Sequence, residues 1–144
     1  MQQQQRGFTL IELTVTTAIV GILAATAYPS FTGPVYKVRR TDAITALMQL
    51  QMSQERWRSG HTSYASLAEL NTSASSSMRY YALSVTESSE TGFSATATGT
   101  GAQAADTACR VLRLTVTGGD TRYASGPDEN TANSSADNKR CWGV

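Results

Sequence analysis

Glu12 is the residue whose position in this chain most needs a chemical explanation. It is the only charged residue in the run from Phe8 to Tyr28, where the other side chains are apolar or small. Such a run is long enough to cross a bilayer as a helix, which takes about 20 residues. Because a carboxylate near the centre of a membrane helix costs about 2.5–3.5 kcal/mol, we expect Glu12 to serve a purpose other than insertion.

Cys109 and Cys141 are the only cysteines, and their spacing favours a structural disulfide. They do not have the C-x-x-C spacing of a catalytic redox pair. A bridge between them would enclose the polar tail 125–139, and closing a loop of this size adds about 3–4 kcal/mol in the chain-entropy model. A stable disulfide also requires an oxidising compartment.

The sequence contains no arrangement typical of an enzyme. His61, the single histidine, follows Gly60 and is expected in a solvated loop, and no glycine-rich phosphate loop or metal-spaced Cys/His cluster is present. We therefore expect no catalytic residue and no cofactor. The polar tail collects oxygen atoms of the kind that calcium binds, but their spacing fits no calcium loop, and a solvated loop is the preferred interpretation. These residues are Asp128, Glu129, Asn130, Asn133, Asp137 and Asn138.

Lys139, Arg140 and Trp142 form the clearest candidate for a ligand contact at the surface. Two cations beside an indole suit a phosphate backbone and a stacked base, which makes DNA a possible partner. The alternative is that Trp142 packs over the disulfide while both cations are solvated. We favour this alternative, because the chain has 12 basic and 11 acidic side chains and so no general attraction for nucleic acid.

Helical periodicity continues beyond the apolar run and predicts one long helix from about Phe8 to Ser59. Pro29 and Pro34 can bend such a helix without ending it, and Gly60 is a natural stop. The chain is long enough for one modest domain behind this helix. The second half of the helix carries an apolar stripe centred on Ile44, Leu47 and Met48, continued by Gln51 with Met52 and widened by Ala43, Ala46 and Leu50.

The C-terminal half shows the alternation typical of strands. Strands are predicted at 80–85, 93–98, 110–116 and 121–124, the last two joined by a turn at Gly118–Gly119. Leu112, Leu114 and Val116 share one face, which can pack on the helical stripe. The predicted fold class is therefore α+β: a long N-terminal helix on a small antiparallel sheet, with a C-terminal disulfide-tied loop.

The N-terminus resembles that of type IV prepilins. The match is dense over residues 6–42 and returns in Cys109, Cys141 and Trp142. Its most specific part reads Arg6-Gly7-Phe8-Thr9-Leu10-Ile11-Glu12-Leu13, followed by Ala-Ile-Val-Gly-Ile-Leu-Ala-Ala at 18–25 and Tyr28-Pro29. The chain is most like minor pilins of the PilE-like group. This resemblance implies the type IV pilin fold and a structural subunit of a bacterial surface filament.

The resemblance also implies how the chain is processed and assembled. In the prepilin family, a membrane peptidase cuts the subunit after the glycine and methylates the new N-terminus. Here the cut would lie between Gly7 and Phe8, and the methylated amine would be that of Phe8. Glu12 then offers its carboxylate to the amine of a neighbouring subunit inside an apolar filament core, where only a paired charge is tolerated. Gly21 and Pro29 weaken the helix between them, so the filament can extend.

The organisation that follows has three parts. Residues 1–7 form a leader, residues 8–28 a transmembrane and filament-core helix, and residues 29–144 an α+β head that includes the second half of the helix. The expected partners are other pilin subunits, prepilin peptidase, the inner-membrane assembly platform and the membrane itself. The subunit is expected in the inner membrane with a cytoplasmic N-terminus, and later in the cell-surface pilus, which serves adhesion and twitching motility.

Several alternatives stay open at this point. Lys37, Arg39 and Arg40 follow the apolar run, and the positive-inside rule alone would predict the reverse orientation. A secretory signal cleaved near 24–27 or a plain anchor could explain the N-terminus, although both leave Glu12 unexplained. A type II secretion pseudopilin is the functional alternative within assembly. A DNA-uptake or adhesive minor pilin is the alternative as a binding module.

Overall fold

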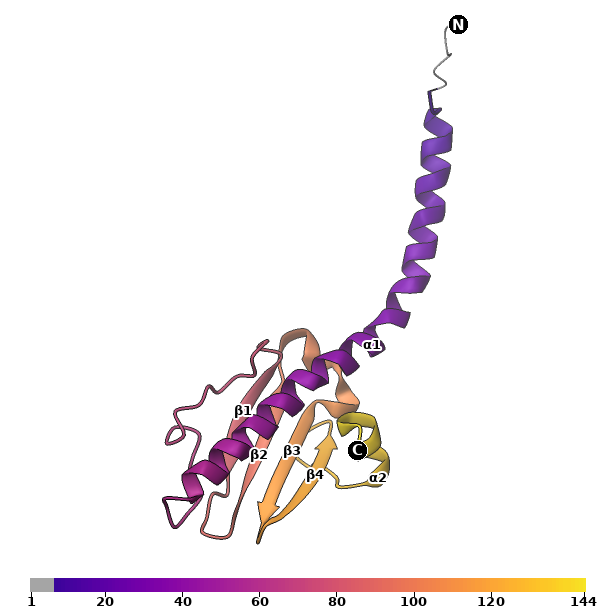
Figure 1. Cartoon of the computed structure of the whole chain (residues 1–144). Coiled ribbons are helices and arrows are strands. Elements are labelled where there is room, and N and C mark those ends of the chain that lie inside the picture. Colours follow the sequence, from indigo (N-terminus) through magenta and orange to yellow (C-terminus); the bar gives the residue numbers. More distant parts are fainter. Residues whose placement is uncertain (1–6) are drawn as a thin grey trace, which may run out of the picture. The chain divides into compact units, whose positions relative to one another are not determined.

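A computed structural model describes residues 7–144, apart from the side chains of residues 28–31. Helix α1 spans Leu10–Arg58 (Figure 1), which confirms the predicted helix to within two residues at its start and one at its end. The chain divides into two compact units, one up to Val35 and the other from Tyr36 to Val144. Most of the predicted leader, Met1–Arg6, lies outside the described residues.

The ends of α1 are set by local hydrogen bonds. At the start, the Glu12 amide donates to Thr9 Oγ1 at 3.3 Å, and the Thr9 amide donates to Glu12 Oε2 at 3.0 Å. This reciprocal pair is a capping box, which satisfies amides that have no partner within the helix. At the other end, the Gly60 amide donates to the Trp57 carbonyl oxygen at 3.1 Å, and Arg58 places a cation beside the last carbonyls.

Four consecutive strands form one antiparallel sheet in the order β1-β2-β3-β4, which confirms the predicted strands. The register pairs Ala97 of the second strand with Leu112 of the third. Gly118 and Gly119 both have positive φ angles, 58° and 91°, as a two-residue hairpin turn requires. The strands are β1 (Tyr81–Thr86), β2 (Gly92–Gly99), β3 (Val111–Thr117) and β4 (Asp120–Gly126).

The second half of α1 lies across one face of this sheet, as Figure 1 shows for the unit from Tyr36 onward. Helix and sheet share one buried cluster, and this arrangement confirms the predicted α+β fold. The helix contributes Ala43, Ala46, Leu47 and Leu50, and the sheet contributes Tyr81, Leu83, Phe93, Ala95, Ala97, Leu112, Leu114 and Val116.

The predicted stripe was right for Leu47, which is buried, and for Ile44, which packs against the core, but wrong for its two methionines. Met48 and Met52, placed toward the sheet by the sequence pattern, are 41% and 55% exposed. The buried side is formed by Leu47 and by the residues predicted to widen the stripe, Ala43, Ala46 and Leu50, and it lies against Ala95 and Ala97 in the middle of β2. Small side chains on both elements let the helix lie close to the sheet, and the long methionines remain on its outer side.

Polar side chains of α1 fix the segment that leads from the helix to β1. Gln54 is fully buried, and its amide group exchanges two hydrogen bonds with the backbone of Ala65, at 2.6 and 2.9 Å. Asp42 accepts from Ser76 Oγ at 2.6 Å and from the Met78 amide at 3.1 Å. These bonds tie an irregular segment to the helix without a second apolar core.

Candidate assembly and binding sites

The first half of α1 is the first candidate site. Within the described residues, Leu10–Ala27 is the one helical segment long and apolar enough to cross a membrane, and none of it is buried by its own chain. Leu10 and Ile22, for example, are exposed. A helix with so much uncovered apolar surface requires lipid or protein around it.

Glu12 lies in this uncovered helix, and its carboxylate is hydrogen-bonded to Thr9. Its Oε2 atom accepts from Thr9 Oγ1 at 2.8 Å and from the Thr9 amide. Neither of the two ion pairs among the described residues, Arg40–Asp106 and Arg140–Asp137, involves Glu12. Within residues 7–144, this carboxylate therefore has hydrogen bonds from Thr9 but no ion-pair partner.

Gly7, Phe8 and Gly21 are not constrained by the fold of this chain. Phe8 is exposed, so the Gly7–Phe8 bond lies at an accessible end. Among the described residues, a Cβ atom added at Gly7 or Gly21 would meet no atom beyond its immediate surroundings in the chain, so contacts with the rest of the described chain do not require glycine there. The backbone is helical through Gly21 and Pro29, while the Pro29 side chain lies outside the described residues.

The C-terminal region is the second candidate site, and a disulfide organises it. Cys109 and Cys141 form the predicted bond with their Cα atoms 5.5 Å apart, and both residues are buried. Cys109 ends a short 3₁₀ turn, Thr107–Cys109, and Cys141 lies in the last helical turn, Asn138–Trp142. The bond thus fastens the C-terminus to the segment before β3.

Trp142 is buried, as the favoured interpretation of the sequence expected, and it is not available to stack a base. Only 6% of it is exposed. Its ring packs on Tyr123 with centroids 4.7 Å apart, and its Nε1 donates to the Ala124 carbonyl oxygen at 3.0 Å. An indole with its ring and its N–H group in use has no free face for a base, so the packing alternative is the correct one.

The neighbouring cations differ in whether they already have a hydrogen-bond or ion-pair partner within the chain. Lys139 and Arg140 are exposed, but Arg140 forms an ion pair with Asp137. Arg110 donates to the Ala104 carbonyl oxygen at 2.8 Å, and Arg113 donates to the Glu129 carbonyl oxygen at 2.9 Å. Lys139 is therefore the cation of this group with the least internal competition for an anion.

The oxygen-rich tail uses its carboxylates to shape turns. Asp137 accepts from Ser134 Oγ at 2.6 Å, and Ser134 Oγ in turn accepts from the Asp137 amide at 3.1 Å, which caps the short helix α2 (Ser135–Asp137). Asp128 accepts from the Asn130 amide at 2.8 Å. Across residues 7–144, no three Asp, Glu, His or Cys side chains lie close enough together to hold a metal ion.

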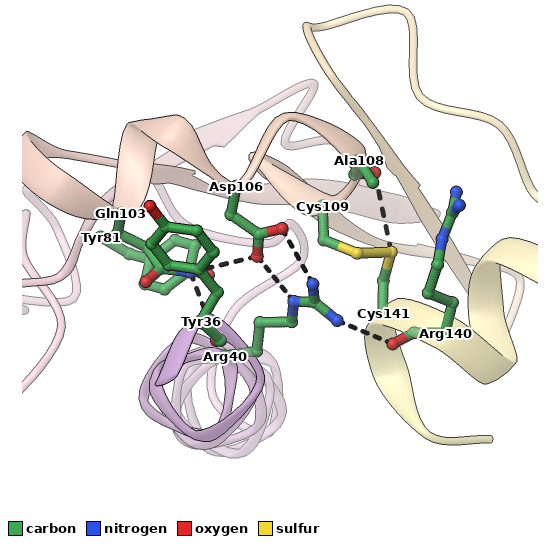
Figure 2. A network of polar contacts seen from close by, with 9 residues as sticks. All are labelled: Tyr36, Arg40, Tyr81, Gln103, Asp106, Ala108, Cys109, Arg140 and Cys141. Carbon is green, nitrogen blue, oxygen red and sulfur yellow. Dashed lines mark hydrogen bonds and ion pairs between the residues drawn. A yellow bond between two sulfur atoms is a disulfide. The ribbon is translucent and has the colours of Figure 1, made fainter. Parts of the chain in front are cut away.

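A buried polar network joins α1 to the disulfide region, and sequence reasoning missed it (Figure 2). Arg40 Nε and Nη2 donate to Asp106 at 2.6 and 2.8 Å, and Arg40 Nη1 donates to the Arg140 carbonyl oxygen at 2.9 Å. Gln103 Nε2 donates to the Tyr81 hydroxyl at 2.9 Å and lies 3.2 Å from Asp106 Oδ2. Burial, strengthened by the nearby Asp106 charge, raises the pKa of Tyr81 to about 12.

Two sequence signals could have suggested part of this network. Arg40 occupies the first turns of the head-forming part of α1, close to the helix positions that face the sheet. Asp106 lies three residues before Cys109 and is the only charged residue between Glu90 and Arg110. Their pairing joins positions 66 residues apart, and no periodicity in the sequence relates such distant positions.

Several known proteins are similar to this chain over less than half of its length. Type IV major pilin protein PilA of Myxococcus xanthus is 40% identical over 65 residues, which are 45% of this chain and 30% of PilA. A fimbrial protein of Neisseria meningitidis is 37% identical over 70 residues, 44% of this chain and 41% of that protein. Type II secretion system core protein G of Dickeya chrysanthemi is 30% identical over 64 residues, 44% of this chain and 42% of that protein. The chain thus spans less than half the length of these curated relatives.

A long N-terminal helix, a four-stranded antiparallel sheet and a C-terminal disulfide together define the type IV pilin fold. The prokaryotic N-terminal methylation motif matches residues 2–28. The family described as type IV minor pilin ComP, DNA uptake sequence receptor, matches residues 29–113. This match covers more than half of the chain, and the chain belongs to that family of type IV minor pilins.

Proposed function

We propose that this chain is a structural subunit, a minor pilin, that assembles into a type IV pilus through its N-terminal helix. The observation that carries the proposal is the segment Leu10–Ala27, which is apolar and wholly uncovered in the single chain. Lipid covers it before assembly, and the same segment of other pilin subunits covers it in the filament. Family membership and the methylation motif at 2–28 support this assignment.

Glu12 is the assembly residue in this proposal. After cleavage between Gly7 and Phe8, each subunit has a methylated amine on Phe8, and each amine needs an anion once it enters an apolar core. Glu12 supplies it, since its carboxylate is hydrogen-bonded to Thr9 but forms no ion pair within the described part of the chain. Pairing in a water-free core is favourable only when both charges are present, because an unpaired buried charge is far more costly than a paired one.

The proposed organisation keeps a leader at 1–7, a membrane and filament-core helix at 8–28, and a head at 29–144. The N-terminus faces the cytoplasm, where prepilin peptidase and the inner-membrane assembly platform act on the subunit. Gly21 and Pro29 are the proposed points at which the helix loses order when the filament extends. The head then lies in an oxidising compartment, which suits the Cys109–Cys141 bond.

Processing is tested by the mass of the mature subunit. A chain that begins with N-methylated Phe8 should be found in pili or in membranes from cells with an active peptidase. Gly7→Leu should remain uncleaved while Gly7→Ala is cleaved, because we expect the peptidase to limit the size of the side chain before the cut. Within the described residues, an added Cβ atom at Gly7 meets nothing that would set such a limit. A mature chain that begins after Ala27 would show a secretory signal instead.

A second candidate function is DNA binding by the head. The observation that favours it is the match to a family described as a DNA uptake sequence receptor, whose model covers the head from residue 29 to 113. The sequence alone made this the less favoured alternative. Lys139 and Arg140 remain the proposed phosphate contacts, without Trp142, and Lys139 should contribute more because Arg140 is paired with Asp137.

The DNA proposal is tested by the salt dependence of binding. Full-length protein in detergent should bind a short duplex, and each lost phosphate contact should reduce the slope of log K against log salt by about 0.9. Lys139→Ala with Arg140→Ala should therefore reduce the slope by the amount that corresponds to at most about two phosphate contacts. Arg56→Ala with Arg79→Ala removes two exposed cations elsewhere on the head and should leave it unchanged. Equal loss in both variants would place the contact elsewhere.

A further inference from the structure

We propose that Arg40 is the positioning residue for the Cys109–Cys141 bond. Its guanidinium binds both chain segments that carry the cysteines, and it holds them side by side before the thiols are oxidised. The proposal concerns the head alone, and it stands whether or not the chain assembles into pili or binds DNA.

The geometry places Arg40 between the two segments (Figure 2). On one side it forms a two-point ion pair with Asp106, and the Cys109 amide donates to the Asp106 carbonyl oxygen at 3.1 Å. On the other side it donates to the carbonyl oxygen of Arg140, the residue before Cys141, at 2.9 Å. A single planar group therefore fixes the approach to each cysteine through bonds that do not involve sulfur.

Burial makes these bonds strong enough to order the region. The Arg40 side chain is 12% exposed and that of Asp106 is 5% exposed. Charge-assisted hydrogen bonds of this two-point geometry are about twice as strong as neutral ones. Separating the pair would leave a buried charge without a partner, so the arrangement persists as long as the head is folded.

The reduced cysteines remain within reach of each other in this arrangement. Disulfide formation requires Cα atoms about 4.4–6.8 Å apart, and Arg40 together with the packing of Trp142 fixes the position of Cys141 from both sides. Cys141 Sγ also lies 3.7 Å from the Ala108 carbonyl oxygen. A reduced Cys141 can donate its thiol proton there, whereas the oxidised sulfur has no proton to donate.

The step that benefits is the second half of thiol–disulfide exchange. One cysteine thiolate attacks a disulfide oxidant, forms a mixed disulfide and releases one thiolate. The other cysteine thiolate then attacks the mixed disulfide and expels the second thiolate of the oxidant. The two cysteines lose two protons and two electrons, and the oxidant becomes two thiols. Arg40 raises the effective concentration of the second cysteine thiolate.

Arg40→Lys is the sharpest variant, because it keeps a positive charge beside Asp106. An ammonium group lacks the planar fork, so it cannot hold Asp106 at two points and the Arg140 carbonyl oxygen at the same time. Full-length protein in detergent would be equilibrated in mixtures of reduced and oxidised glutathione, and the oxidised fraction read from the mass after thiol alkylation. We expect the equilibrium constant for bond formation to fall about tenfold, which is about 30 mV for this two-electron couple.

Three further variants separate positioning from general stability. Arg39→Lys alters the neighbouring arginine, which lies over the Tyr80 ring, and should leave the equilibrium unchanged. Gln54→Ala destabilises the head by removing the two hydrogen bonds to the Ala65 backbone, far along the helix from the cysteines. When the two variants are compared at the same loss of stability in urea, Gln54→Ala should shift the thiol–disulfide equilibrium much less than Arg40→Lys. Arg40→Met with Asp106→Leu, which leaves no charge unpaired, should give the same shift as Arg40→Lys.

Two results would overturn the proposal. An Arg40→Lys equilibrium equal to that of the unchanged protein would show that the thiols meet without this contact. Equal shifts in Arg40→Lys and Gln54→Ala, at matched stability, would show that the bond responds only to how well the head is folded.

Discussion

Replacing Trp142 by alanine should lower the melting temperature of the head strongly while leaving every proposed contact surface intact. Loss of a buried large aromatic side chain costs about 3–5 kcal/mol. That range includes the hydrogen bond to the Ala124 carbonyl oxygen, about 1 kcal/mol, and the ring contact with Tyr123, about 0.5–1.5 kcal/mol. For a head of this size, with about 4 °C per kcal/mol, the expected fall is about 12–20 °C.

Thermal melting followed by circular dichroism, on the full chain in detergent, measures this fall. Trp142→Phe keeps a ring against Tyr123 but loses the N–H donor, so it should lose only about 4–8 °C. Trp57→Ala is the matched control, because Trp57 is half-buried and stacks on the exposed His61 with ring centroids 3.8 Å apart. A Trp142→Ala protein that melts like the unchanged protein, or a larger effect from Trp57→Ala, would refute the burial of the indole.

Two more predictions test the core and its polar edge. Leu47→Ala should destabilise the head by about 2–5 kcal/mol in urea titrations, whereas Met48→Ala should change it by less than about 1 kcal/mol because Met48 is exposed; a loss from Met48→Ala as large as that from Leu47→Ala would place Met48 in the core after all. The free energy of unfolding should fall as the pH rises from the ordinary tyrosine pKa of 10.0 toward about 12, because burial raises the folded-state pKa of Tyr81 and the unfolded chain loses that proton first. Tyr81→Phe should flatten this alkaline slope, and an unchanged slope would show that other groups cause it.

The regular elements were predictable because each has its own local signal. Gly60 and the apolar run bound α1, and the Gly118–Gly119 pair marks the hairpin between β3 and β4. Alternation in 110–116 placed Leu112 and Leu114 on the inner face, where both are buried. These signals depend only on residues near one another in the chain.

The rotation of α1 on the sheet could not be predicted in the same way. Met48 fits a helical stripe as well as Leu50 does, and hydrophobicity alone favours neither. The choice depends on Ala95 and Ala97 in a distant strand, which leave room for a small-sided helix face. The packing partner of Trp142 could not be predicted for the same reason. Tyr123 is 19 positions away in the sequence, and the fold of the hairpin and the disulfide bring the two rings together.

The structural role of Arg40 could not be predicted from the sequence. In the sequence, Arg40 was one of three cations after the apolar run, with Lys37 and Arg39, and was considered only as evidence for the orientation of the helix in the membrane. In the folded head its side chain is only 12% exposed, pairs with Asp106 and donates to the carbonyl oxygen of the residue before Cys141. A charged side chain that follows a membrane helix is normally solvated. Arg40 is largely shielded from solvent because the segments around Asp106 and Arg140, both distant in the sequence, pack against it.

Incorporation of a Glu12→Val subunit into pili is the most direct test of the central claim that α1 assembles through a paired carboxylate. Epitope-tagged subunits would be expressed with the other pilins, and the tagged fraction in sheared pili would be compared with that in the membrane. Glu12→Asp, which keeps the charge, serves as the matched control.

The account predicts that Glu12→Val reaches the membrane at least as well as the unchanged chain, because a costly charge is gone. Its incorporation should fall at least tenfold, since an amine left unpaired in an apolar core costs about 3–5 kcal/mol, while Glu12→Asp keeps a substantial part. Normal incorporation of Glu12→Val would contradict the account.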